Sequence, residues 1–214
     1  MQVRFLTTAS AVALLIPNVA FAQAAPADGA QMDIVVTAQK RPERAQNVPI
    51  SLTALSGEDL SKANVSTVLD LPRVAPGFFA NRVQQTSNTR LTIRGIGTAG
   101  NAAIEPSVGA FVDGIYIPRP GPLLAALNDV SGVEVLRGPQ GTLSGRNASM
   151  GAILFSTTAP RNESTLNGSL EGGSYGRIRA SVIANAALSD LVAVRTSVLW
   201  DRTTGTGFNV LNNT

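Results

Sequence analysis

The chain has 214 residues, 44% of them hydrophobic and 14% charged, so it has enough apolar side chains to bury a core and is not expected to be disordered throughout. Cysteine and histidine are both absent, which excludes a disulfide framework, a thiolate metal site and a Ser-His-Asp catalytic triad. The formal net charge is +3 and the cations are scattered, whereas a nucleic-acid-binding protein would gather them on one face.

The first 22 residues have the pattern of a secretion signal. Arg4 supplies a minimal positive region, Ala11 to Ile16 form an apolar centre, and Ala20-Phe21-Ala22 places small residues where a signal peptidase cleaves. The stretch is too short for a transmembrane helix and is interrupted by Pro17. We expect export and cleavage after Ala22, with a buried N-terminal helix as the alternative.

A short β-branched run follows between two polar segments. Asp33-Ile34-Val35-Val36-Thr37-Ala38 has high strand propensity, but Gln39 to Arg44 is too polar to continue a buried strand. We therefore expect a strand without a partner in its own neighbourhood, whose backbone is free to pair with the sheet edge of another protein. Pairing inside its own domain is the alternative, and the run by itself leaves both open.

Residues 46–160 indicate one small α+β domain. Ser56 and Asp59 have capping-box spacing and predict a helix that runs toward Ala63. Asp113-Gly114 between two apolar runs predicts a two-residue hairpin turn. The other expected elements are strands at 50–55, 91–94, 133–135 and 152–156, a helix at 66–71 that stops before Pro72, a helical turn at 123–127 and a glycine-rich loop at 138–151.

After Pro160 the pattern changes to long alternating segments. Apolar and polar residues alternate over about ten residues at a time, which is typical of the strands of a transmembrane β-barrel. A soluble antiparallel sheet with one wet face is the alternative, because alternation is common to both. The expected strands lie at 166–170, 178–185 and 192–201, with a tight turn at Ser189-Asp190.

Two motifs that resemble cofactor or catalytic signatures fail on their context. Gly95 to Gly100 matches the dinucleotide-binding glycine pattern, but the few residues before the apolar run at Val108 include Pro106 and leave no room for the crossover helix. Gly172 to Gly176 matches the nucleophile-elbow pattern, but the chain has no histidine to act as a base. We expect no enzyme activity, no cofactor and no metal.

Several segments together resemble the TonB-dependent outer-membrane receptors. Asp33 to Ala38 resembles the TonB box of that family, Arg90 to Gly95 the arginine-glycine strand of its plug domain, and Val112 to Tyr116 the plug hairpin. The longest match is Val133-Glu134-Val135-Leu136-Arg137-Gly138-Pro139-Gln140-Gly141-Thr142-Leu143, continued by Gly145-Arg146-Asn147-Ala148 and Gly151-Ala152-Ile153. Ser144, Ser149-Met150 and Leu154 depart from the usual family residues.

The resemblance implies a fold and a division of the chain. In this family a plug fills the lumen of a barrel of about 22 strands. We expect an α+β plug domain, with a small mixed sheet and short helices, followed by the first antiparallel strands of a transmembrane β-barrel that is incomplete in this chain. The implied segments are a signal peptide at 1–22, a segment with the TonB box at 23–45, the plug at 46–160 and barrel strands at 161–214.

The resemblance also assigns site residues. Asp33, Ile34, Val35, Val36, Thr37 and Ala38 become the segment on which TonB, with its ExbB/ExbD complex, pulls. Arg94 and Arg137 match plug arginines that pair with carboxylates of the barrel wall, although a lumen-facing arginine solvated by water is the alternative. The remaining plug-motif residues are Gly95, Asp113, Gly114, Gly138, Pro139, Gly141, Gly145, Arg146 and Asn147.

The family resemblance also implies a function. The resemblance implies location in the outer membrane, contact with its lipid, and active uptake of a scarce extracellular small molecule, with a ferric siderophore as the first expectation. Because only about three barrel strands are visible, we expect an N-terminal fragment of a longer receptor. The alternative is a periplasmic interaction module that does not transport, and coding sequence beyond Thr214 would distinguish the two.

Overall fold

The structure is a computed structural model, and it describes residues 35–37, 40–41, 43–82, 89–97, 105–118 and 127–204. All of these lie in one compact unit that spans Asp33–Thr214. Among the described residues, no helix has the length and apolar character needed to cross a membrane.

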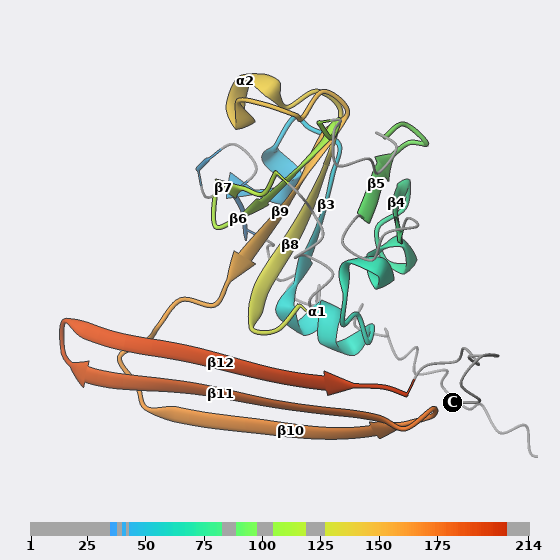
Figure 1. The fold of residues 1–214 in the computed structure, drawn as a ribbon. Coiled ribbons are helices and arrows are strands. Elements are labelled where there is room, and N and C mark those ends of the chain that lie inside the picture. Colours follow the sequence, from blue (N-terminus) through green and yellow to red (C-terminus); the bar gives the residue numbers. More distant parts are fainter. Residues whose placement is uncertain are drawn as a thin grey trace, which may run out of the picture. The chain divides into compact units, whose positions relative to one another are not determined.

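A five-stranded mixed sheet forms the centre of the α/β domain (Figure 1). In spatial order its strands are β3 (Leu52–Ser56), β8 (Val130–Arg137), β9 (Gly151–Thr157), β6 (Val108–Val112) and β7 (Ile115–Tyr116). The pair β6–β9 is parallel and the other pairs are antiparallel. The long strand β8 therefore lies between β3 and β9, with both of its edges hydrogen-bonded.

Short helices and a hairpin pack on this sheet and close the main core. They are α1 (Gly57–Lys62), the 3₁₀ helix η2 (Val68–Arg73) and the hairpin of β4 (Phe78–Arg82) with β5 (Thr89–Ile93). The core contains Leu71, Phe78, Ile93, Val133 and Ile153, all fully or almost fully buried. Burial of such side chains supplies the main driving force for folding this domain.

Residues before the domain form a small two-stranded unit. Strand β1 (Val35–Val36) pairs antiparallel with β2 (Glu43–Arg44), and the 3₁₀ helix η1 (Ala45–Asn47) leads into the domain. The prediction that the β-branched run has no partner in its own neighbourhood is therefore wrong. The alternative, pairing inside its own domain, is what the structure shows. The partner comes from the segment that was too polar to continue a buried strand, because β2 needs only backbone groups to pair and leaves its charged side chains partly exposed.

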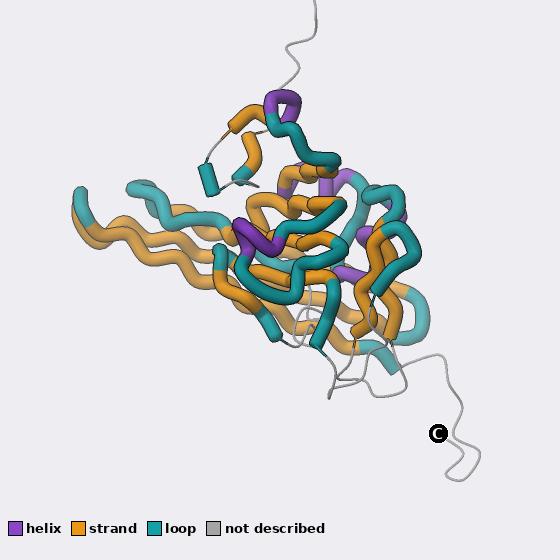
Figure 2. Tube along the Cα trace, turned by 90° about the horizontal axis from the view of Figure 1, so that it is seen from above, coloured by secondary structure: helices purple, strands orange, loops and turns teal. Residues whose placement is uncertain are grey.

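A separate three-stranded antiparallel sheet follows, with β10 (Thr165–Gly173), β11 (Arg177–Ser189) and β12 (Val192–Arg202) in sequence order. The three strands run side by side in both views (Figures 1 and 2). One face is apolar: Leu170, Ala180 and Trp200 are cross-strand neighbours there, as are Val182 and Val198. Many of these apolar side chains are exposed, so the expected alternation is present and its apolar side is uncovered.

The structure confirms the fold class, a mixed α/β domain followed by antiparallel strands that do not close into a barrel. The capping box is confirmed, since Ser56 accepts from the Asp59 backbone and Asp59 accepts from the Ser56 backbone. The hairpin turn is confirmed as well, because Asp113 and Gly114 both have positive φ angles, +49° and +80°, which suit the twist of a two-residue hairpin.

Three local predictions need correction, and one strand was not predicted. The second helix begins at Val68 and continues through Pro72 to Arg73 as a short 3₁₀ helix rather than an α-helix. The glycine-rich loop contains a one-turn helix, α2 (Gly141–Ser144). Strand β4 was not predicted, and the turn after β11 is Asp190-Leu191 rather than Ser189-Asp190. Residues 123–126 of the expected helical turn lie outside the described residues.

Candidate functional site: a docked N-terminal segment and a charged junction

The N-terminal segment lies on the α/β domain through an apolar contact and a polar one. Val36 is fully buried in a small cluster with Val48 and Leu136 of β8. Next to it, Thr37 donates two hydrogen bonds to Oε1 of Glu134, from its backbone N at 2.7 Å and from its Oγ1 at 3.1 Å. Asp33, Ile34 and Ala38 of the predicted TonB box lie outside the described residues.

Glu134 is a buried carboxylate with only half of its acceptors used. Its exposure is 7%, and no group among the described residues donates to the buried Oε2. A carboxylate taken out of water is stable only when donors replace the lost hydration, and here those donors belong to Thr37. Glu134 was part of the sequence motif but received no role from it, because the sequence gives no sign that Thr37 and Glu134 meet.

The two predicted arginines meet at one turn of the domain. The backbone N of Arg94, a residue with a φ of +52°, donates to the Gly77 carbonyl at 2.7 Å. The Arg137 guanidinium donates to the Pro76 carbonyl, from Nε at 3.1 Å and from Nη2 at 2.7 Å, and to Oγ1 of Thr53 at 2.6 Å. Burial lowers the pKa of Arg137, and the positive charge of Arg94 lowers it further.

Neither arginine has a carboxylate within ion-pair distance among the residues that the structure describes. The arrangement therefore concentrates two like charges at the Pro76–Gly77 turn. The partly buried Arg137, which lies near the exposed Arg94, is stabilised when an anion approaches it.

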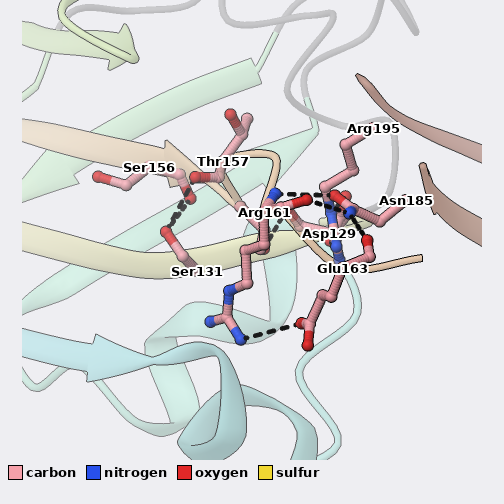
Figure 3. A network of polar contacts seen from close by, with 9 residues as sticks. Asp129, Ser131, Ser156, Thr157, Arg161, Glu163, Asn185 and Arg195 are labelled. Carbon is pink, nitrogen blue, oxygen red and sulfur yellow. Dashed lines mark hydrogen bonds and ion pairs between the residues drawn. The ribbon is translucent and has the colours of Figure 1, made fainter. Parts of the chain in front are cut away.

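An ion pair that the sequence did not predict joins the α/β domain to the three-stranded sheet (Figure 3). Arg195 of β12 donates from Nε and Nη2 to the two carboxylate oxygens of Asp129, both at 2.7 Å. The two side chains are only 15% and 11% exposed. These hydrogen bonds hold the pKa of the Asp129 carboxyl below its usual value. Fork-to-fork geometry of this kind is the strongest form of carboxylate–guanidinium contact.

The chain that connects the two sheets is held at the same junction. Asn185 of β11 accepts from the Arg161 backbone N at 3.1 Å and donates to the carbonyl oxygens of Arg161, at 2.7 Å, and Glu163 (Figure 3). Thr158 donates from its backbone N and its Oγ1 to the Asp129 carbonyl, at 3.0 and 3.1 Å. The polar face of the three-stranded sheet thus contacts the domain, while its apolar face does not.

A polar cavity of about 400 Å³ lies beside the junction. Its lining includes Ser61 and Val65 from the α1 region, Asp129, and Glu171 and Arg179 from the polar face of the three-stranded sheet. Within the described residues, no group of His, Cys, Asp or Glu is arranged to hold a metal ion. The side chains around the cavity and the junction offer hydrogen bonds and charge.

The remaining plug-motif residues shape turns around the sheet. Gly95, Gly138 and Gly145 have positive φ angles, as do Asn147 and the hairpin residues Asp113 and Gly114. Asp113 accepts from the backbone N and Oγ1 of Thr157, both at 2.8 Å, and Asn147 donates to the Tyr116 hydroxyl at 2.6 Å. Gly141 opens α2, and Pro139 and Arg146 are exposed on either side of it. These residues position backbone, and none of them forms a reactive cluster.

A protein-family model described as "TonB-dependent Receptor Plug Domain" matches residues 44–152 of the chain. Those residues include four strands of the five-stranded sheet (β3, β6, β7 and β8), the first two residues of β9, and Arg94, Glu134 and Arg137.

Curated relatives and solved structures agree with this match. The chain is 37% identical over 161 residues to the pesticin receptor of Yersinia pestis, covering 75% of this chain and 23% of the relative. It is 27% identical over 167 residues to the catecholate siderophore receptor Fiu of Escherichia coli K12, covering 76% and 21%. The crystal structure of the ferric yersiniabactin uptake receptor FyuA from Yersinia pestis matches with a TM-score of 0.62 and 33% identity, over 70% of this chain and 24% of that one. The chain thus spans about a quarter of the length of these relatives.

Proposed function

Since the chain belongs to the TonB-dependent receptors through its plug domain, we propose that it is the N-terminal part of an outer-membrane receptor that takes up a scarce solute, with a ferric siderophore as the first candidate. The observation that carries the proposal is the orientation of the three-stranded sheet. Its polar face contacts the plug through Arg195, which binds Asp129, and its apolar face is exposed. That is the arrangement of a lipid-facing wall around a plug.

The proposal divides the chain as its sequence suggests. Residues 1–22 direct export and are cleaved after Ala22, residues 23–45 carry the TonB box, residues 46–160 form the plug and residues 161–214 begin the wall. Within this scheme, Arg94 and Arg137 receive their counter-charges from carboxylates of the wall. Their convergence on one turn without an anionic neighbour among the described residues supports this role.

Energy enters through the TonB box in this proposal. TonB, with its ExbB/ExbD complex, pairs with Asp33 to Ala38 by strand addition, and the pull on that segment rearranges the plug. The docked position of Val35–Val36 and Thr37 requires that the segment first leave Val48, Leu136 and Glu134. Residues 33–38, the handle on which TonB pulls, thus have two alternative partners: TonB and the plug.

The function is tested by uptake of radiolabelled iron in iron-starved cells. Ferric yersiniabactin and a ferric catecholate are suitable probes, because relatives of this chain are receptors for ligands of these kinds. We expect accumulation that requires both this gene and TonB. Accumulation that is unchanged when either is deleted would contradict the proposal for those ligands.

A proline substitution tests the backbone nature of the handle. Proline at Val35 removes a backbone donor and fixes φ, whereas alanine keeps the backbone intact. We expect Val35→Pro to abolish TonB-dependent uptake and Val35→Ala to retain most of it, since the Val35 side chain is largely exposed. Equal uptake by the two variants would mean that TonB does not read the backbone of this segment.

A further inference from the structure

We propose that Glu134 is the residue that holds the TonB box on the plug, and that it sets the fraction of receptors whose handle is free. The inference rests on the proposed function, because it concerns the segment on which TonB pulls. It assigns a positioning role to a side chain that lies outside the box.

Val36 and Thr37 dock on β8 in a defined register. Side chains two positions apart on a strand lie on the same face. Glu134 and Leu136 are related in this way, and they contact Thr37 and Val36 respectively. Consecutive residues of the handle therefore meet consecutive positions on one face of one strand, the first contact apolar and the second polar. The match explains why the segment docks in one register.

The acceptor Glu134 lies on a strand that is paired on both sides. Glu134 pairs with Ala54 on β3 and with Leu154 on β9, so hydrogen-bonded strands flank it on both sides. The backbone that carries the carboxylate is therefore held by both neighbouring strands whether or not the handle is docked. Only the handle has to move to make or break the contact.

Thr37 donates to only one of the two carboxylate oxygens of Glu134. Hydrogen bonds to a carboxylate are stronger than those between neutral groups, so Thr37 is held firmly at Oε1. Oε2 is buried, and within the part of the chain that the structure describes no donor replaces its lost hydration. When the handle leaves, water can reach the site that Thr37 covered and restore that hydration. The hydrogen bonds to Oε1 thus favour docking, whereas the lost hydration of Oε2 opposes it. These opposing contributions suit a contact that forms and breaks reversibly.

The contact between Thr37 and Glu134, the latch, lies on a strand that is tied to the three-stranded sheet. Asp129, which Arg195 grips through both oxygens, immediately precedes the first residue of β8. The strand that receives the handle is thus tied to the wall at its N-terminal end. A pull on Thr37 acts on an anchored strand, so the latch gives way before the strand moves.

The test uses a spin label on the handle. The chain contains no cysteine, so Val35→Cys gives a single labelling site, and Val35 is 59% exposed and outside the latch contact. The label is observed by electron paramagnetic resonance in isolated outer membranes that contain the receptor and lack TonB. We expect Glu134→Ala to raise the ratio of mobile to immobile label about tenfold, in line with the loss of hydrogen bonds to a charged group.

Two further variants separate a latch from a general loss of packing. Glu134→Gln keeps an oxygen that accepts from Thr37, so it should return the ratio most of the way to that of the unmodified chain. Thr37→Val leaves β8 untouched and removes one of the two donors, so it should raise the ratio about threefold, less than Glu134→Ala. The matched control is Glu58→Ala, which removes an exposed acid that contacts Lys62 and not the handle; it should change nothing.

Unchanged spectra for both Glu134→Ala and Thr37→Val would overturn the proposal. Equal mobilisation by Glu134→Gln and Glu134→Ala would also overturn it, because the acceptor oxygen would then be irrelevant. The measurement needs neither ligand nor TonB, so its outcome is independent of uptake. Normal uptake with unchanged spectra rejects the latch alone, and a mobilised label without TonB-dependent uptake rejects the transport function alone.

Discussion

The plug and the three-stranded sheet obey the same period-two rule with opposite results. In the plug, β8 and β9 carry apolar side chains such as Val133, Val135 and Ile153 that are fully buried. In the three-stranded sheet, the apolar side chains Val182, Val198 and Trp200 are about half exposed or more. Alternation sets which residues share a face, but it does not set which solvent that face meets.

The polar faces differ as well. The plug buries few polar side chains, and Glu134 is one of them. The wall turns its polar side chains toward the plug, where Asn185 and Arg195 hold the linker and Asp129. Polar groups are therefore concentrated where the two regions meet. The comparison teaches that the three-stranded sheet directs its polar face toward the plug and leaves its apolar face exposed.

The largest expected effect breaks the plug side of this comparison. Phe78 is fully buried in the core, whereas Phe79, the next residue of β4, is 51% exposed. We expect Phe78→Ala to lower the free energy of unfolding of the plug by about 3–5 kcal/mol, because it leaves a cavity as well as losing burial. Phe79→Ala should cost less than about 0.5 kcal/mol. Urea unfolding of the two variants, followed by circular dichroism, measures the difference, and comparable losses would mean that β4 does not face a packed core.

The next effect sharpens the wall side. Val198 lies on the apolar face, and its neighbour Ser197 lies on the polar face. We expect Val198→Arg to destabilise the inserted receptor by about 2–4 kcal/mol if the residue lies near the membrane midplane, since arginine is costly against lipid. Ser197→Arg should be much milder. Reversible folding of the complete receptor into phospholipid vesicles provides the measurement, and a larger loss for Ser197→Arg would reverse the assignment of the two faces.

The sequence predicted the parts of this molecule that depend on local chemistry. The capping box of Ser56 and Asp59 and the hairpin at Asp113-Gly114 use short-range hydrogen bonds and positive φ angles, so their residues suffice to identify them. The wall strands were predicted because their alternation extends over many residues. The family resemblance, carried by the motif around Arg137, was confirmed by the match to the plug-domain model.

The contacts between distant segments were not predictable in the same way. Nothing local distinguishes Thr37 as a donor to Glu134, or Asp129 as the partner of Arg195, because both pairs join residues far apart in sequence. The pairing of β1 was left open for a different reason: its partner, Glu43–Arg44, is near in sequence but has no apolar pattern and contributes its backbone. Gly151 is a further example. Its φ is +147°, and a side chain at this position would collide with the Leu136 carbonyl, which becomes visible only when β8 and β9 pair.

The smallest expected effect concerns the junction between the two regions. The pKa of Asp129 is lowered by its hydrogen bonds to Arg195, so this contact favours the ionised carboxyl in the folded state. Its contribution to stability is fully present above the pKa of the unfolded chain, near 4, and is lost as the pH falls through the lower pKa of the folded state. Asp129→Asn should lower the free energy of unfolding at pH 7 by about 1.5–3 kcal/mol, the usual value of hydrogen bonds to a charged group.

The pH dependence makes this prediction specific to the junction. As the pH falls from 7 to about 3, the difference in stability between the unmodified receptor and Asp129→Asn should shrink, because protonation removes the same charge that the substitution removes. Glu58→Gln, which alters an exposed ion pair with Lys62, should change stability by at most about 1 kcal/mol at either pH. If the Asp129→Asn difference instead stayed constant down to pH 3, the carboxylate charge would not be what ties the plug to the wall, and the neutral contacts of Asn185 and Thr158 would have to carry that role.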